Sequence, residues 1–217
     1  MTPELENYIE RHIDAEPANL YELNRQTNIR LLNGRMCSGH LQGRLLKMLV
    51  AMINPRRVLE LGTFSGYSAL CIAEGLSDDA TLDTVEVDDE MEDFIRDAFR
   101  KSPVGDRISL HIGDGTEVTR RFADETFDLI FIDADKRQYA EYFEESMRVL
   151  KPGGFIIADN TLWGGHVVEP DHQKDRQTAG ILRFNDLVAA DSRVETVIIP
   201  LRDGLTILRK LNPTAMR

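Results

Sequence analysis

The stretch from about residue 57 to residue 159 alternates short apolar runs with amphipathic segments, and this alternation limits the possible folds most strongly. Runs typical of strands lie near 57–61, 81–87, 107–112, 128–133 and 154–159. Helical spacing of apolar residues predicts helices between or after them, near 66–76, 88–101, 115–123, 137–150 and 178–190. Because right-handed strand-helix-strand units build a parallel sheet covered on both faces, the sequence predicts a doubly wound α/β fold.

Both ends of the chain depart from this alternation. Helical segments are expected near 3–14, 17–33 and 39–53, before the first strand. Near the other end, Asp203-Gly204 joins two β-rich stretches and is typical of a hairpin. We therefore expect one domain of 217 residues, with a helical cap (1–55) and a Rossmann-like core (56–217). The core should hold seven strands, mostly parallel, with an antiparallel strand from the C-terminal hairpin, and its only long loop near 161–177.

Charge and hydropathy argue against several classes of function. The net charge of −11 disfavours non-specific binding to nucleic acid or to acidic membranes. No apolar run approaches the ~20 residues of a membrane span, and the start lacks a signal peptide's features, so a cytoplasmic protein is expected. Between Glu22 and Glu60 the only charged residues are basic, namely Arg25, Arg30, Arg35, Arg44, Lys47, Arg56 and Arg57. This segment faces either an anionic substrate or the protein's own acids.

The cysteines and histidines show no metal-binding spacing. Cys37 and Cys71 lie far apart in the sequence, so they are expected to be free thiols in a reducing compartment. The five histidines, at positions 12, 40, 111, 166 and 172, form no HxxxH pair and have no cysteine neighbour. The sequence therefore argues against a zinc site.

The first strand leads into a glycine-containing turn, "VLELGTFSGYSAL". In open α/β sheets ligands bind outside the carboxyl ends of the strands, so Gly62 and Gly66 would let the backbone approach a ligand closely. The spacing is GxxxG, whereas a dinucleotide site requires GxGxxG, and many ordinary tight turns share it. The turn alone therefore leaves open whether a cofactor binds.

The end of the next strand indicates which class of ligand would bind. It ends in Glu86, where an acid can accept hydrogen bonds from both hydroxyls of a ribose, which indicates a nucleoside. Glu60 directly before the turn would repel a phosphate and attract an amino group. These charges favour an adenosine that carries an amino-acid arm and a sulfonium over NAD. After the third strand, Gly113 and Gly115 could lie against an adenine ring or form an ordinary turn.

Polar side chains end the fourth and fifth strands. "LIFIDADKRQY" places Asp133 at the end of one strand, and "FIIADN" places Asp159 and Asn160 at the end of the next. Parallel strands deliver these side chains to the same edge, where two carboxylates repel unless a cation lies between them. Two carboxylates and an amide oxygen suit Mg²⁺ or a similar ion. Alternatively, Asp159 merely starts a turn and Asp133 caps a helix.

Five segments together resemble the cation-dependent O-methyltransferases, the family of caffeoyl-CoA and catechol O-methyltransferases, and its bacterial members most closely. They occur in the family's order from Met36 onward: "MCSGHLQGRLLKML", "LELGTFSGYS", "VEVDD", "FIDADK" and "ADNTLWGG". The chain differs from animal catechol enzymes at Ala134-Asp135, and from plant caffeoyl-CoA enzymes at Gly164, which leaves substrate contacts at that loop open.

The resemblance implies S-adenosylmethionine as methyl donor and a homodimer joined through the opening helices. It also implies a divalent cation, with Mg²⁺, Mn²⁺ and Ca²⁺ all open, held by Asp133, Asp159 and Asn160. The residues that it places around the donor are Met36, Ser38, Glu60, Gly62, Ser68, Glu86, Gly115, Asp133 and Asp135. Met36 and Ser38 would close over donor and metal, and Met36 would also contact the substrate.

Lys136 is the candidate general base, acting beside Asp133, and the adjacent metal and the sulfonium would favour its neutral form. A solvated lysine in the first turn of a helix is the alternative. Trp163 would wall the acceptor ring or pack in the core. The expected acceptor is a catechol-like or other hydroxylated aromatic molecule, and hydroxyuridine in tRNA is the runner-up. A dehydrogenase fits the glycine turn less well. A donor-binding protein without catalysis fits the intact metal set less well.

Overall fold

The computed structural model describes residues 2–172 and 174–212. Its centre is one seven-stranded sheet in the order β3-β2-β1-β4-β5-β7-β6. The strands are β1 (Arg57–Leu61), β2 (Thr81–Glu86), β3 (Ile108–Ile112), β4 (Phe127–Ile132), β5 (Leu150–Ala158), β6 (Val194–Ile199) and β7 (Leu205–Lys210). Strands β1 to β5 are parallel, and β7 runs antiparallel to both β5 and β6. The expected fold, including the antiparallel hairpin strand, is confirmed.

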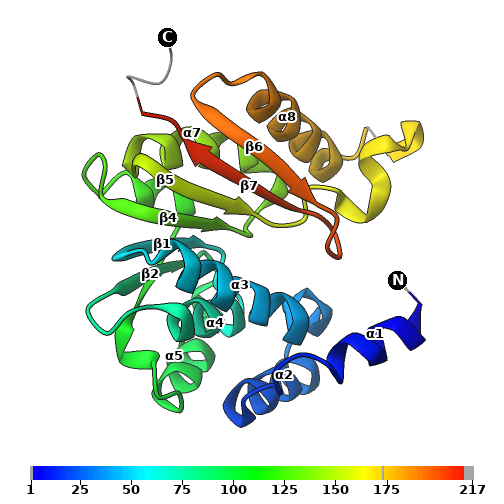
Figure 1. Ribbon diagram of the computed structural model, residues 1–217, viewed down its shortest axis with the longest axis vertical. Helices are drawn as coiled ribbons and strands as arrows, with labels where there is room; N and C mark the ends of the chain where they lie inside the picture. Colours follow the sequence, from blue (N-terminus) through cyan, green and yellow to red (C-terminus); the bar gives the residue numbers. More distant parts are fainter. Residues whose placement is uncertain (1, 173, 213–217) are drawn as a thin grey trace.

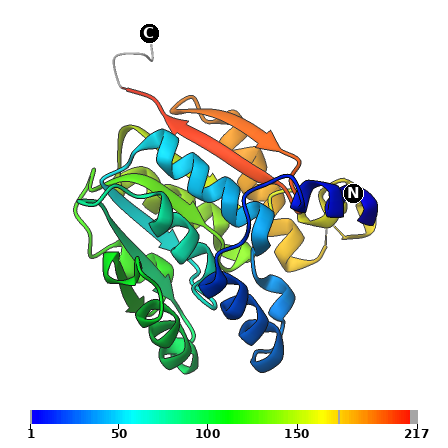
Figure 2. The same ribbon diagram turned by 60° about the horizontal axis from the view of Figure 1, so that its bottom comes forward.

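Helices cover both faces of this sheet (Figure 1). One face packs against α2 (Ala18–Arg30), α3 (Gly39–Ile53), α4 (Tyr67–Gly75) and α5 (Glu92–Arg100). The other packs against α6 (Gly115–Thr119), α7 (Tyr139–Val149) and α8 (Arg176–Ala190). In Figure 2 the helix α3 lies across the first of these faces, while α1 (Pro3–Glu10) projects beyond the sheet. Burial on both faces explains why the strands read as continuous apolar runs.

The order of the strands fixes where a ligand can bind. From β1 the chain builds outward to β2 and β3, then returns to place β4 on the other side of β1. The helices that follow β1 and β4 therefore leave on opposite faces, and a crevice opens above the carboxyl ends of these two strands. All the polar strand ends singled out in the sequence point to this edge.

Most element boundaries agree with the sequence pattern, and the exceptions have local causes. Helix α1 ends at Glu10 instead of residue 14, because the side chains of Arg11 and His12 bond back to the carbonyls of Asn7 and Tyr8. Strand β5 begins four positions before the expected residue 154. A register shift opposite Phe127 and Leu129 lets the chain pair through a segment whose Pro-Gly-Gly sequence is typical of a turn.

Two further segments differ from expectation. Helix α6 stops at Thr119, four residues before the predicted end at 123, and continues as single turns. The predicted loop 161–177 contains two short 3₁₀ helices, η5 (Trp163–Val168) and η6 (Pro170–His172). Within the described ranges, no helix has the length and apolar character needed to cross a membrane.

Candidate active site

The ends of β4 and β5 bring the predicted acids together. Ile132 pairs with Ala158 in the parallel register, and the amide of Asp159 donates to the carbonyl of Ile132 at 2.9 Å. Asp133 and Asp159 therefore follow a paired position on neighbouring strands, which lie about 4.8 Å apart. Asn160 follows directly, in the left-handed conformation (φ 58°) that asparagine tolerates better than most residues. All three residues line the same cavity.

Asp159 is held rigidly within the protein. Its side chain is buried, one carboxylate oxygen accepts a hydrogen bond from Gln42 Nε2 at 2.5 Å, and the other accepts one from the Asn160 amide at 2.7 Å. Burial, together with the negative charge of Asp133, raises the pKa of Asp159 above that of an ordinary aspartate. A cation between the two carboxylates would remove this repulsion.

Gln42 is a contact that the sequence analysis missed. It is 2% exposed and lies on α3, the helix whose apolar face packs against the sheet. A polar residue among the leucines of a core-facing helix was the available signal. Its partner lies 117 residues away in the sequence, so only the fold could identify it.

Lys136 contacts the site directly. Its Nζ lies 2.6 Å from Asp133 Oδ1, and the side chains of both residues are largely buried. The same ammonium lies 5.3 Å from the centre of the Tyr139 ring, so the lysine is not a freely solvated surface residue. Asp135, two residues from Asp133, instead pairs with Arg137, whose charge and hydrogen bonds lower the pKa of Asp135.

A cavity of about 1070 Å³ lies along this edge of the sheet and extends from β2 to the loop after β5. Most of the residues predicted for donor, metal and substrate line it, namely Met36, Ser38, Gly62, Glu86, Gly115, Asp133, Asp135, Lys136, Asp159, Asn160 and Trp163. Glu60 and Ser68 are not among the lining residues; both are buried beside it. Its volume is at the upper end of the range typical of small-molecule sites.

Glu60 is completely buried at the end of β1. Thr84 donates a hydrogen bond to its Oε2 at 2.5 Å, while Oε1 has no hydrogen-bond partner. Burial raises the pKa of Glu60 to about 8, and hydrogen bonds from Ser68 and Thr84 oppose that rise only in part. A buried, unpaired carboxylate oxygen of this kind needs a donor, and a bound cationic group would supply one.

The turn after β1 depends on glycine and on Glu86. Gly62 has φ +98°, and a Cβ there would collide with the backbone carbonyl of Asp133, so no other residue fits. The carboxylate of Glu86 accepts hydrogen bonds from the amides of Phe64 at 2.7 Å and Asp88 at 3.0 Å. These contacts fix its orientation at the cavity wall.

Part of the basic segment pairs with the protein's own acids, one of the two interpretations left open by the sequence. Arg44 pairs with Glu74 at 2.7 Å, and Arg57 pairs with Asp83 at 2.8 Å, so these two arginines balance the protein's own acids. Arg35 instead lines the main cavity. From the β6–β7 loop, Arg202 reaches the same side, where its guanidinium bonds the carbonyls of Cys37 and Ser38.

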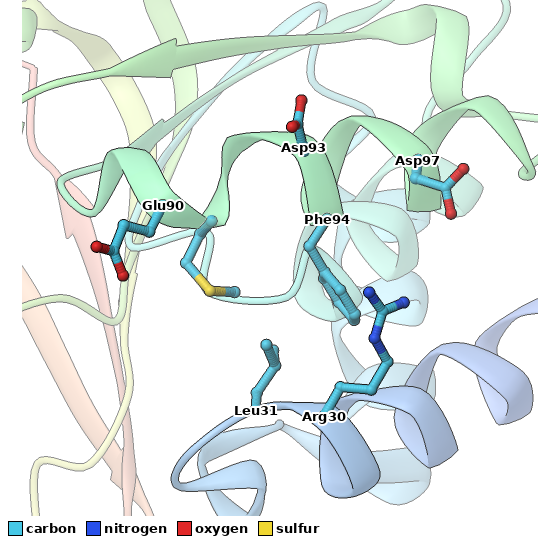
Figure 3. A pocket seen from close by; sticks show the side chains of 7 residues that line it. Arg30, Leu31, Glu90, Asp93, Phe94 and Asp97 are labelled. Atoms are coloured by element: carbon cyan, nitrogen blue, oxygen red, sulfur yellow. The ribbon is translucent and has the colours of Figure 1, made fainter.

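A smaller cavity of about 330 Å³ lies between α2 and α5 (Figure 3). Its lining includes three carboxylates and the Arg30 guanidinium, which lies 5.4 Å from the centre of the Phe94 ring. None of the residues predicted for chemistry lines it. The larger cavity is therefore the candidate active site.

The cysteines are free, as the sequence predicted, while two of the histidines form a group that the sequence analysis did not anticipate. Cys37 and Cys71 are free and buried, as expected. His166 and His172, however, meet around Glu169, and one ligand atom from each of the three residues lies within 4.8 Å of the others. The spacing of three residues was overlooked because only the HxxxH pattern of an α-helix was considered.

Known proteins share the sequence pattern and the fold of this chain. A family model described as O-methyltransferase matches residues 10–211. Caffeoyl-CoA O-methyltransferase 1 of Eucalyptus globulus is 33% identical over 180 residues, covering 79% of this chain and 73% of the relative.

Two solved structures share the fold. The O-methyltransferase TomG of Streptomyces achromogenes, in complex with SAM, has a TM-score of 0.88 and 26% identity, covering 98% of this chain and 100% of that one. An O-methyltransferase of Bacillus cereus in complex with SAH has a TM-score of 0.85 and 28% identity, covering 95% and 97%. The chain belongs to the cation-dependent O-methyltransferase family, that of the caffeoyl-CoA O-methyltransferases.

Proposed function

We propose that this enzyme transfers a methyl group from S-adenosylmethionine to a hydroxyl of a catechol-like or other hydroxylated aromatic molecule, with the help of a divalent cation. The observation that supports the proposal is that Asp133, Asp159 and Asn160 follow neighbouring strand ends and all line one large cavity. The donor is supported by the SAM and SAH complexes of the two similar structures.

The three side chains fit a hard divalent cation. They offer only oxygen donors. Burial first, and the negative charge of Asp133 second, raise the pKa of Asp159, and a positive ion would relieve the repulsion between the two carboxylates. Mg²⁺ is the first choice, while Mn²⁺ and Ca²⁺ accept the same ligand types. When bound, the ion would stabilise the anionic form of an acceptor hydroxyl and help to orient the acceptor.

Several residues are proposed to hold the donor. Glu86 would accept hydrogen bonds from the ribose hydroxyls, and Gly115 would lie beside the adenine. The unpaired oxygen of Glu60 offers a partner for a cationic amino group close to Gly62 and Ser68. Asp135 would approach the amino-acid arm, and Met36 and Ser38 would cover the donor from the opposite wall.

Methyl transfer from a sulfonium to oxygen is an in-line displacement that requires an oxygen close to its anionic form. An ordinary phenol, with a pKa near 10, is only about 0.1% ionised at neutral pH. We assign Lys136 Nζ, beside Asp133, as the group that accepts the hydroxyl proton. The lysine would first release its own proton to solvent, and the positive charges of a bound cation and of the sulfonium would favour that neutral amine. The methyl group then moves from sulfur to oxygen as the carbon–sulfur bond breaks. Trp163 would form the wall against the acceptor ring.

The test is a methyl-transfer screen with SAM over diol-bearing aromatics and bulk tRNA, each with Mg²⁺ and with EDTA. Transfer to aromatic diols that EDTA abolishes would support the proposal. Chelator-insensitive transfer would contradict the cation's role, and transfer to tRNA with a steep salt dependence would favour the alternative acceptor. The homodimer through α1 to α3 is a separate proposal, to be tested by sedimentation.

A further inference from the structure

The loop between β5 and α8 holds a cluster of donors that the methyl-transfer site does not use. His166, Glu169 and His172 are spaced three residues apart, and their backbones are linked by i to i+3 hydrogen bonds of 3.1 Å, from the Glu169 amide to His166 and from the His172 amide to Glu169. The two turns do not form one continuous helix, because η5 ends at Val168 and Glu169 has extended backbone (φ −99°, ψ 113°) before η6 begins at Pro170. The two successive turns nevertheless bring the three side chains within reach of one another.

The side chains already converge. His166 Nδ1 lies 2.7 Å from Glu169 Oε2, and His172 Nε2 lies 3.4 Å from the same oxygen. The two imidazole rings are stacked with their centres 4.0 Å apart. One ligand atom from each residue lies within 4.8 Å of the others. Tetrahedral zinc, with bonds near 2.0–2.1 Å, separates its ligand atoms by about 3.3 Å, so only side-chain rotation is needed to close the site.

Ion pairing alone explains this arrangement poorly. All three side chains are 41–49% exposed, and exposed ion pairs contribute only ~0–1 kcal/mol to stability. Two imidazoles also share a single carboxylate oxygen, and when both are protonated they repel each other across the stack. A divalent cation would bind all three groups at once. It would bind the imidazoles in their neutral form, in which they do not repel each other.

We propose that His166, Glu169 and His172 form a second metal site, selective for Zn²⁺ or a similar transition-metal ion. Two imidazole nitrogens and one carboxylate oxygen are ligands that zinc prefers, whereas the oxygen donors at the strand ends suit Mg²⁺. Three protein ligands leave a fourth position for water. The ion would join η5 to η6 and restrain the loop that begins at Trp163, a wall of the main cavity.

The binding test uses metal-free protein, Zn²⁺ and Co²⁺ in excess Mg²⁺. We expect one Zn²⁺ per chain and the intense visible absorption of four-coordinate Co²⁺. His166→Ala and His172→Ala should each weaken Zn²⁺ binding by at least about 10- to 100-fold, the loss seen when even a supporting contact of a metal ligand is removed. His12→Ala, which removes another exposed histidine, is the matched control and should bind normally. Asp159→Asn should also retain this zinc site.

A second readout follows the loop itself. Zn²⁺ should slow cleavage by trypsin after Lys174 and Arg176 in the wild type and in His12→Ala, but not in His166→Ala. Thermal unfolding without metal checks that each variant is folded. The proposal is overturned if His166→Ala binds Zn²⁺ as tightly as the wild type, if Asp159→Asn alone abolishes binding, or if Co²⁺ shows only the weak spectrum of a six-coordinate ion.

Discussion

The strand ends and the loop that follows them hold three candidate metal ligands each, yet the two regions are built differently. At the strand ends, Asp159 is buried and fixed by Gln42 and a backbone amide, so two repelling carboxylates are held together by the fold. In the loop, His166 and Glu169 are nearly half exposed and are brought together by a single local backbone turn. A rigid scaffold can maintain unfavourable charge for catalysis, whereas an exposed loop can gather only groups that tolerate one another.

The largest effect is expected from Asp159→Asn, which tests whether the buried region is the catalytic one. Losing a charged ligand removes several kcal/mol of stabilisation of the anionic acceptor, so kcat should fall by about 1,000-fold or more. The measurement is methyl transfer at saturating Mg²⁺, with SAH affinity by calorimetry to show that the donor site survives. Asp186→Asn, an exposed aspartate on α8, is the matched control. Activity within tenfold of wild type would show that Asp159 is not a ligand.

Gln42→Leu tests whether rigidity at the strand ends matters to the metal. The variant removes the 2.5 Å hydrogen bond to Asp159 without adding charge. Loss of such a supporting contact should raise the Mg²⁺ concentration for half-maximal activity by about 10- to 100-fold, with kcat recovered at high Mg²⁺. A fall in kcat that Mg²⁺ cannot restore would instead show general damage to the site, which circular dichroism and thermal unfolding would report.

Glu60 tests how burial changes the pH dependence of stability, an effect that the exposed loop should lack. Its pKa is raised to about 8, so the folded state keeps a proton that the unfolded state has released above about pH 4.5. The free energy of unfolding should therefore decrease as pH rises towards 8, by roughly 1 kcal/mol per pH unit from this group.

Urea unfolding of the ligand-free protein at pH 6, 7 and 8 measures this slope. Glu60→Gln, which is neutral at every pH, should flatten it. An identical slope in wild type and variant would place the responsible group elsewhere. SAH should also bind with proton release near pH 7 if its amino group contacts Glu60, and calorimetry in buffers of different ionisation enthalpy would detect that release.

The smallest effect is expected from His166→Ala on methyl transfer with Mg²⁺ and no zinc. The side chain is half exposed and does not line the main cavity, so the change should stay within about twofold. Steady-state kinetics of the variant beside His12→Ala gives the comparison. A tenfold loss in His166→Ala alone would mean that the loop takes part in catalysis without any metal.

Much of the fold and the site followed from patterns in the sequence. Alternating strands and helices predicted a parallel sheet, and the rule that parallel strands end at the same edge predicted that Asp133 and Asp159 would meet. Glycine at position 62 was expected to let the backbone approach a ligand, and the structure shows that it lets the backbone approach the carbonyl of Asp133. These inferences succeeded because each depends on local periodicity and on a topological rule that few sheets break.

Other features depended on contacts that no local pattern encodes. Gln42 and its partner Asp159 lie 117 residues apart, and Arg202 reaches the carbonyl of Ser38 from 164 residues away. The histidine cluster was missed for a different reason, since a spacing of three residues brings these side chains together only because the backbone forms two successive i to i+3 turns. Helix ends such as that of α1 were set by side-chain hydrogen bonds to carbonyls.

By itself the sequence determined the order of the elements, the edge at which the acids gather and the family to which the chain belongs. The tertiary structure decided which helix supports Asp159, that Glu60 is buried, and that three side chains of the loop lie close together. The physical reason is that backbone periodicity acts between near neighbours along the chain, whereas burial and charge act between any groups that folding brings close.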